Sequence, residues 1–206
     1  MMKSGRILAL VLPLVLVGCG GLIPDQPYIA KTEWPLAPNP PPFEGYHAAK
    51  GVVLVRSVLP GPGMEQTGLM TLRRDGSLHR GYYNRWAVPP DEALTAALIT
   101  WLEASGEFKA VVSDGSVLTP NLLVEATLNT LIADPSAREA RATMTLVISK
   151  PVGLGAVPLI QRRLVAVEPL SGRSAAELVA AQRAAVASLL EQAVQLVRRA
   201  QVNIKT

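Results

Sequence analysis

Three segments in the second half of the chain alternate between apolar and other residues with a period of two. They cover Leu122–Asn129, Arg141–Ile148 and, less cleanly, Ile160–Ala166. The turn residues Asp134-Pro135-Ser136 separate the first two segments, and a break rich in proline and glycine, Pro151–Pro158, separates the last two. Because side chains on a strand point alternately to the two faces of a sheet, we predict an antiparallel meander with one solvated face.

The first half of the chain carries further strand signals. Val52–Val58 is rich in β-branched residues, and the prolines and glycines of Pro60–Gly63 end it. The dipeptide Asp75-Gly76 joins two further apolar runs, Leu69–Arg74 and Leu78–Trp86. Asp-Gly between two such runs predicts a β-hairpin, because glycine accepts the positive φ of tight hairpin turns. A short strand over Phe108–Ser113 is also expected.

Two segments follow the helical period. The first begins at Pro89-Pro90 and ends at Gly106, with Leu94, Leu98, Trp101 and Leu102 on one face. The second runs from Ser174 to about Arg199, with its leucines and valines within about 120° of the helical wheel. Gln182 is the one polar residue on that apolar face. Packing against a sheet explains this face best, and a coiled-coil partner helix is the alternative.

The order of these elements predicts an α+β fold, a mixed α/β sandwich. We expect a largely antiparallel sheet with a short middle helix and a long C-terminal helix packed on one face. Residues 51–206 would form this single domain, since a chain of 206 residues is too short for two large ones. Between residues 19 and 50 seven prolines and little apolar periodicity indicate an extended spacer, to which Tyr28 and Trp34 could add docking contacts.

The N-terminus has the layout of an export signal. Lys3 and Arg6 precede an apolar run from Ile7 to Val17, which is shorter than the roughly 20 residues that span a bilayer as a helix. Residues 1–18 are therefore expected to be a signal peptide, cut between Gly18 and Cys19. Its removal takes two positive charges from the formal net charge of +4.

Composition narrows the chemistry further. A single cysteine excludes an internal disulfide or a cysteine-rich metal site, and the chain has two histidines, His47 and His79. Neither has the spaced partners of a catalytic triad or a metal-binding helix, so we expect no catalytic residues and no metal. Phosphate-binding loops are absent, and Gly153-Leu154-Gly155 lacks the third glycine of a dinucleotide fingerprint. We therefore expect a protein that is not an enzyme.

The one cysteine instead completes a lipidation motif. Leu16-Val17-Gly18-Cys19 resembles the lipobox of bacterial lipoproteins. That resemblance implies a diacylglycerol on the Cys19 sulfur and an N-acyl chain, such as palmitate, on its new amine, with no other cofactor. Two or three acyl chains hold a protein on a membrane stably. Gly20, in place of the aspartate that favours inner-membrane retention, implies export to the outer membrane.

Aromatic residues make up 4% of the chain but gather at the end of one predicted strand. Tyr82, Tyr83, Arg85 and Trp86 lie within five residues of each other, directly before the first helix. Tyrosine, tryptophan and arginine are enriched in binding hot spots, so these four residues are candidates for binding a protein partner. The alternative is that Trp86 fills the junction between sheet and helix and that Arg85 binds local carbonyls.

The chain resembles the ABC-type transport auxiliary lipoproteins. The resemblance rests on the lipobox, on the early strand with its proline-bearing turn, and on Arg85-Trp86-Ala87 before the prolines. This family includes the PqiC-like lipoproteins of MCE-type lipid transport systems, which commonly have Arg-Trp-Ala-Glu-Pro at this point. The present chain has Val88 in place of that glutamate. The likeness extends over roughly Gly51–Arg199 and includes the meander and the long final helix.

The resemblance implies a non-catalytic lipoprotein on the periplasmic face of the outer membrane. Such a subunit docks an MCE-domain protein, which connects it to an inner-membrane ABC permease and ATPase and supports phospholipid transport. A different binding module, for envelope assembly or the cell wall, is the alternative. The sequence leaves a homo-oligomer open. The basic pairs Arg73-Arg74, Arg162-Arg163 and Arg198-Arg199 are too scattered for a nucleic-acid footprint.

Overall fold

The computed structural model describes residues 28–43, 45–46 and 50–203, which form one sheet of nine strands and two helices. In chain order the elements are β1 (Thr32–Trp34), β2 (Val52–Val55), β3 (Leu59–Pro60), β4 (Gly68–Leu72), β5 (Leu78–Trp86), α1 (Pro90–Ala104), β6 (Ala110–Ser113), β7 (Leu122–Asp134), β8 (Glu139–Val152), β9 (Gly155–Pro169) and α2 (Ala175–Asn203).

Strand β7 is the centre of the sheet. Along one edge it pairs in parallel with β2, β3 and β4 in turn, and along the other it pairs antiparallel with β8, which pairs antiparallel with β9. The remaining strands lie on the side of β2, β3 and β4. There β5 pairs with β4, β1 pairs with β5, and β6 pairs with β2. The sheet is therefore mixed, and its longest ladders are antiparallel, as the meander pattern predicts.

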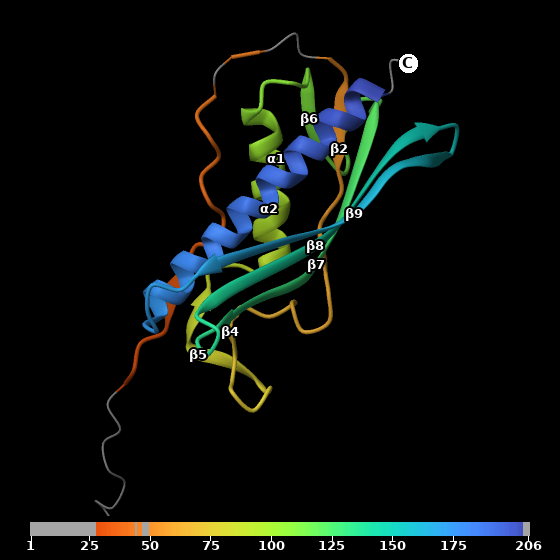
Figure 1. The fold of residues 1–206 in the computed structure, drawn as a ribbon. Helices are drawn as coiled ribbons and strands as arrows, with labels where there is room; N and C mark the ends of the chain where they lie inside the picture. Colours follow the sequence, from red (N-terminus) through yellow and green to blue (C-terminus); the bar gives the residue numbers. More distant parts are fainter. Residues whose placement is uncertain (1–27, 44, 47–49, 204–206) are drawn as a thin grey trace, which may run out of the picture.

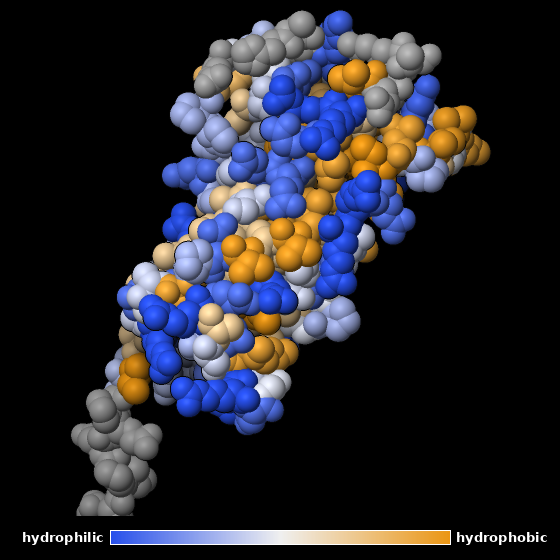
Figure 2. Space-filling view, in the orientation of Figure 1, coloured by the Kyte–Doolittle hydropathy of each residue, from blue (hydrophilic) through white to orange (hydrophobic). Residues whose placement is uncertain are grey.

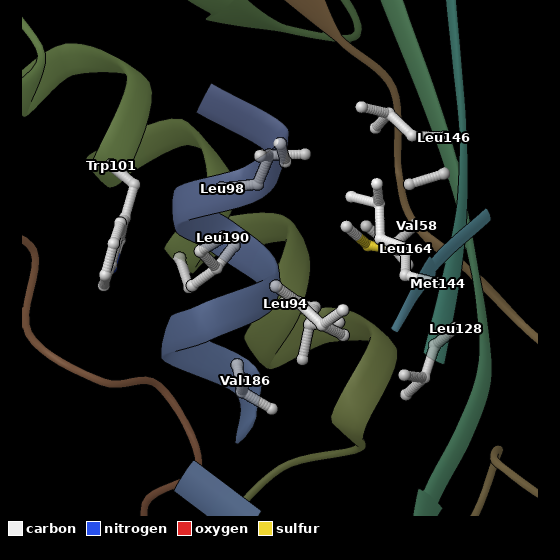
Figure 3. Packing of buried hydrophobic residues seen from close by; sticks show 14 of the residues in the cluster. Val58, Leu94, Leu98, Trp101, Leu128, Met144, Leu146, Leu164, Val186 and Leu190 are labelled. Carbon is white, nitrogen blue, oxygen red and sulfur yellow. The ribbon is translucent and has the colours of Figure 1, made fainter. Parts of the chain in front are cut away.

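Both helices cover the same face of this sheet (Figure 1). The alternating apolar residues of β7 and β8 point to that face, and Leu128, Met144 and Leu146 are fully buried there. They form one core cluster with Leu94 and Leu98 of α1 and with residues of α2 (Figure 3). The predicted α+β class, with a short middle helix and a long final helix on one face, is confirmed.

The helix boundaries follow the signals in the sequence. Helix α1 begins after Pro89, and Gly106 adopts a φ of +66° just after its end. Helix α2 begins with a capping box, in which the Ser174 hydroxyl accepts a bond from the Glu177 amide while the Glu177 carboxylate accepts one from the Ser174 amide. None of the helices that the structure describes is long and apolar enough to cross a bilayer.

The hairpin predicted around Asp75-Gly76 is confirmed, with a φ of +82° at Gly76. The strand expected over Val52–Val58 is shorter, because its last residues turn toward the helices. The Val58 amide donates to the Thr95 hydroxyl of α1 at 2.9 Å, and the Val58 side chain is buried. The chain then rejoins β7 as β3.

The break expected over Pro151–Pro158 is in fact the end of a hairpin. Strands β8 and β9 stay paired up to Val152 opposite Gly155, and Gly153-Leu154 forms the turn, with a φ of +57° at Gly153. Proline is tolerated here because β7 no longer pairs with β8 beyond Ser149, so the free side of the strand has no amide bond to lose. The prediction of a break at this point is wrong.

A second difference concerns the segment in which we expected a spacer. Its described part contains β1, which pairs in parallel with β5, and Leu36, which is only 1% exposed. The indole of Trp101 also donates to the Pro38 carbonyl oxygen at 3.2 Å. The apolar side chains within this proline-rich segment thus dock it on the domain, whereas Tyr28 is exposed.

The polar intrusion on the apolar face of α2 also has an explanation. Gln182 is fully buried, and its Nε2 donates to the carbonyl oxygen of Met70 at 3.2 Å. This carbonyl lies beside the bulge in β4, between Gly68 and Met70. Gln182 therefore connects α2 to β4 by a buried hydrogen bond, while its Oε1 is buried without a partner among the described residues.

We predict that Gln182→Ala lowers the free energy of unfolding by about 1–3 kcal/mol, because the buried hydrogen bond to the Met70 carbonyl and the packing of the Gln182 side chain are lost. Denaturant unfolding monitored by circular dichroism measures the change. Gln195→Ala, at an exposed position of the same helix, is the control and should stay within about 0.5 kcal/mol of the parent protein. Equal effects of the two substitutions would contradict the role assigned to Gln182.

Candidate docking surfaces

The aromatic residues singled out in the sequence lie where β5 meets β1. The parallel register places Thr32 beside Asn84, Glu33 beside Arg85 and Trp34 beside Trp86. The indole of Trp34 donates to the Asn84 side-chain oxygen at 3.2 Å, which fixes the two strands side by side. This strand pair forms one end of the molecule, shown at the lower left of Figure 1.

The four predicted partner-binding residues divide into two groups. Trp86 is 1% exposed and belongs to the main core cluster, so its side chain fills the junction of sheet and helix. Arg85 forms an ion pair with Glu33, with Nε and Oε1 3.4 Å apart. It therefore binds a carboxylate of β1 and not the local carbonyls considered above.

Tyr82 and Tyr83 are the members of this group with exposed rings. Their ring centroids are 5.1 Å apart in an edge-to-face arrangement, and the Lys31 ammonium lies 4.1 Å from the Tyr82 centroid. Such pairs hold rings in place while leaving their outer faces free. The result is a small aromatic and cationic surface directly beside the point where the described chain begins.

The structure reveals a groove that the sequence analysis missed. It lies between β9 and α2, encloses about 490 Å³, and is lined by Arg162, Arg163 and Arg199 together with Leu164 and Leu196. The amide of Gln192 closes part of it by donating to the Val165 carbonyl at 3.1 Å. Sequence reasoning placed these arginines on unrelated solvated positions, because nothing local shows that β9 and α2 are neighbours.

In the described part of the chain, the two groups with a shifted pKa have structural roles. Hydrogen bonds from Ser77 lower the pKa of Asp75 in a turn, and bonds from Ser174 lower the pKa of Glu177 at the start of α2. Within residues 28–43, 45–46 and 50–203 no group of three or more His, Cys, Asp or Glu residues has the arrangement of a metal site.

The predicted cleavage and lipidation site, Gly18 and Cys19, lies outside the described residues, as does His47. The described chain begins at Tyr28, just before β1 and beside the Tyr82–Tyr83 surface.

The sequence model of the ABC-type transport auxiliary lipoprotein component matches residues 35–194. The match covers well over half of the chain and spans β2 through most of α2. The chain therefore belongs to the ABC-type transport auxiliary lipoprotein family, as the sequence resemblance predicted. No curated protein matches the chain.

Solved structures support the same fold. The chain is similar to protein XCC0632 from Xanthomonas campestris, with 16% identity, a TM-score of 0.72, and coverage of 85% of this chain and 100% of that one. It is also similar to the protein CT253 from Chlamydia trachomatis, with 13% identity, a TM-score of 0.53, and coverage of 73% and 96% respectively. At these identities the likeness shows the fold alone.

We predict that Trp86→Ala lowers the free energy of unfolding by about 3–5 kcal/mol, because a large buried ring is replaced by a cavity. Thermal or denaturant unfolding measures the loss. Tyr82→Ala should cost less than about 1 kcal/mol, since its exposed ring contributes only a cation–π contact and one ring pair. A stable Trp86→Ala domain would contradict the core role of this tryptophan.

Proposed function

We propose that this protein is a non-catalytic subunit of an ABC-type phospholipid transport system. Anchored at the periplasmic face of the outer membrane, it docks an MCE-domain protein that leads to the inner-membrane permease and ATPase. The family match over residues 35–194 carries the proposal, because the family consists of auxiliary lipoproteins of ABC-type transport. Localisation in the outer membrane, the MCE partner and the lipid cargo are the parts that we add from the sequence resemblance.

The anchor in this proposal is Cys19, carrying a diacylglycerol and an N-acyl chain. Nine Cα-to-Cα steps lead from Cys19 to Tyr28, where the described chain begins, and they span at most about 30 Å. The domain would therefore remain close to the membrane, with the β1–β5 end nearest to it. Exposed tyrosine and lysine side chains suit this position, since both are favoured at membrane–water interfaces.

We predict that Cys19→Ala releases the protein from the membrane into the soluble periplasmic fraction, because the acyl chains supply the membrane affinity. Cell fractionation followed by immunoblotting checks the result. Cys19→Ala protein that stays in the membrane fraction would contradict the lipoprotein assignment. Sucrose-gradient separation of the two membranes then places the parent protein in the inner or the outer one.

A docking role agrees with what the described surfaces offer. The titratable groups with a shifted pKa, Asp75 and Glu177, serve a turn and a helix cap. The surfaces described above are open and shallow, and their aromatic and arginine side chains are of the kinds enriched at protein interfaces. We propose Tyr82 and Tyr83 as a contact with the partner close to the membrane.

We predict that the native protein, crosslinked and purified in mild detergent, recovers MCE and ABC components of one transporter. The variant combining Tyr82→Ala and Tyr83→Ala should recover several-fold less while its melting temperature is nearly unchanged. Quantitative mass spectrometry measures both outcomes. Enrichment of β-barrel or peptidoglycan-associated proteins without any transporter component would instead favour the alternative envelope-assembly or cell-wall module.

A further inference from the structure

The hairpin formed by the end of β8 and the beginning of β9 projects beyond the rest of the sheet. The last pair between β7 and β8 joins Leu123 to Ser149, whereas β8 and β9 remain paired to Val152 and Gly155. Residues 150–159, which we call the projecting hairpin, are therefore two strands without a neighbour on either side. Figure 1 shows them extending past the covered face of the sheet, away from α2.

Apolar side chains dominate the projecting hairpin. Leu154 at the turn is fully exposed, and Val152, Val157 and Leu159 are 54%, 51% and 38% exposed. Figure 2 shows this gathering of hydrophobic residues at the upper right of the molecule. None of the four belongs to a core cluster. Because gathered exposed apolar residues mark interaction sites, folding of the domain alone does not account for these side chains.

The charged residues on the stretch of β8 and β9 that contains the projecting hairpin are all basic. From Ala140 to Val167 the chain contains no aspartate or glutamate, and its charged residues are Arg141, Lys150, Arg162 and Arg163. Arg162 and Arg163 line the groove between β9 and α2, just beyond the base of the hairpin, where Glu191 of α2 is the one acidic lining residue. A surface that complements this arrangement has an apolar recess for the tip and carboxylates around its rim.

The projecting hairpin and the anchored end lie at opposite ends of the molecule. Near one end of β7, Ala133 pairs with β4, and β4 is followed in the sheet by β5 and β1. The projecting hairpin begins beyond Leu123, at the other end of β7. The thirteen steps along β8 from Glu139 to Val152 correspond to about 43 Å of strand. With an anchor at Cys19, the hairpin tip points away from the membrane that holds the protein.

We propose that the projecting hairpin is the membrane-distal docking element of this protein and that it inserts into an apolar, carboxylate-rimmed recess of a protein component of the transporter. This inference rests on the proposed function, since it takes the anchor and the transporter from there. Basic and apolar residues could bind either a protein or the lipids of a membrane. Because the hairpin points away from the anchoring membrane, a protein is the favoured occupant.

The first test places a photo-crosslinking amino acid at position 154 of the full-length lipoprotein in its native host. We expect an adduct with a transporter component, identified by mass spectrometry, and no such adduct from position 167. Val167 lies near the other end of β9, the strand that follows this turn, and is 46% exposed. An adduct with phospholipid, an adduct with a second copy of this chain, or no adduct at position 154 would overturn the proposal.

A matched pair of substitutions provides the second test. Val157 and Val167 are similarly exposed on β9, and each faces a basic residue across the ladder, Lys150 and Arg141 respectively. We expect Val157→Asp to lower recovery of the transporter about tenfold or more, and Val167→Asp to leave it unchanged, with both variants melting normally. Equal recovery by the two variants would overturn the role of the hairpin.

The two tests separate this inference from the proposed function. If the unsubstituted protein recovers transporter components and the Val157→Asp variant recovers them equally well, the proposed function stands and the hairpin inference fails. If the unsubstituted protein recovers no transporter component, the proposed function itself fails.

Discussion

Burial of one face of the sheet beneath the two helices is the constraint on which the rest of the structure depends. The alternation of apolar residues along β7 and β8 supplies that face, and α1 and α2 supply the matching apolar stripes. At about 25 cal/mol per Å² of apolar surface removed from water, such contacts supply most of the free energy that orders the chain. The polar exception, Gln182, is fully buried in this face, where its Nε2 donates to the Met70 carbonyl oxygen of the sheet.

This arrangement decides which surfaces remain for other molecules. The covered face is fully used by the core, so partners have access to the ends of the molecule, the edge at β9 and the uncovered face. One end carries β1, the exposed tyrosines and the connection to the proposed anchor. The other end carries the projecting hairpin, where the strands continue beyond their cover. The role that we propose uses both ends: the β1 end lies near the membrane and contacts the partner through Tyr82 and Tyr83, and the projecting hairpin is the membrane-distal docking element.

The sequence predicted those elements whose signals are local. Proline at the start of α1 and the Asp75-Gly76 turn each act over a few residues, and each marks its element correctly. The family could also be predicted, because short motifs before the first helix accompany the lipobox. Long-range pairing was harder to predict, and β1 is the clearest case: it is three residues long and pairs with residues about fifty positions away.

The candidate docking surfaces were less predictable than the fold, because they too depend on long-range pairing. For the cluster of Tyr82, Tyr83, Arg85 and Trp86 the sequence left two roles open, partner binding or burial of Trp86 at the junction of sheet and helix. The structure buries Trp86 in the core and leaves the tyrosines facing solvent. Prolines at 151 and 158 indicated a break, because their tolerance in the hairpin depends on where β7 stops pairing with β8 and on the free outer edge of β9. The groove beside α2 required two elements that only the tertiary structure brings together.

Hydrogen–deuterium exchange tests the central claim, that the end opposite the anchor docks the transporter, most directly. Backbone amides of the lipid-anchored protein would be compared between the purified transporter complex and the protein released from it. The account predicts slower exchange in the complex at residues 150–159 and unchanged exchange at the turn of residues 135–138, at the opposite end of β8. Unchanged exchange at residues 150–159 in an intact complex would contradict it.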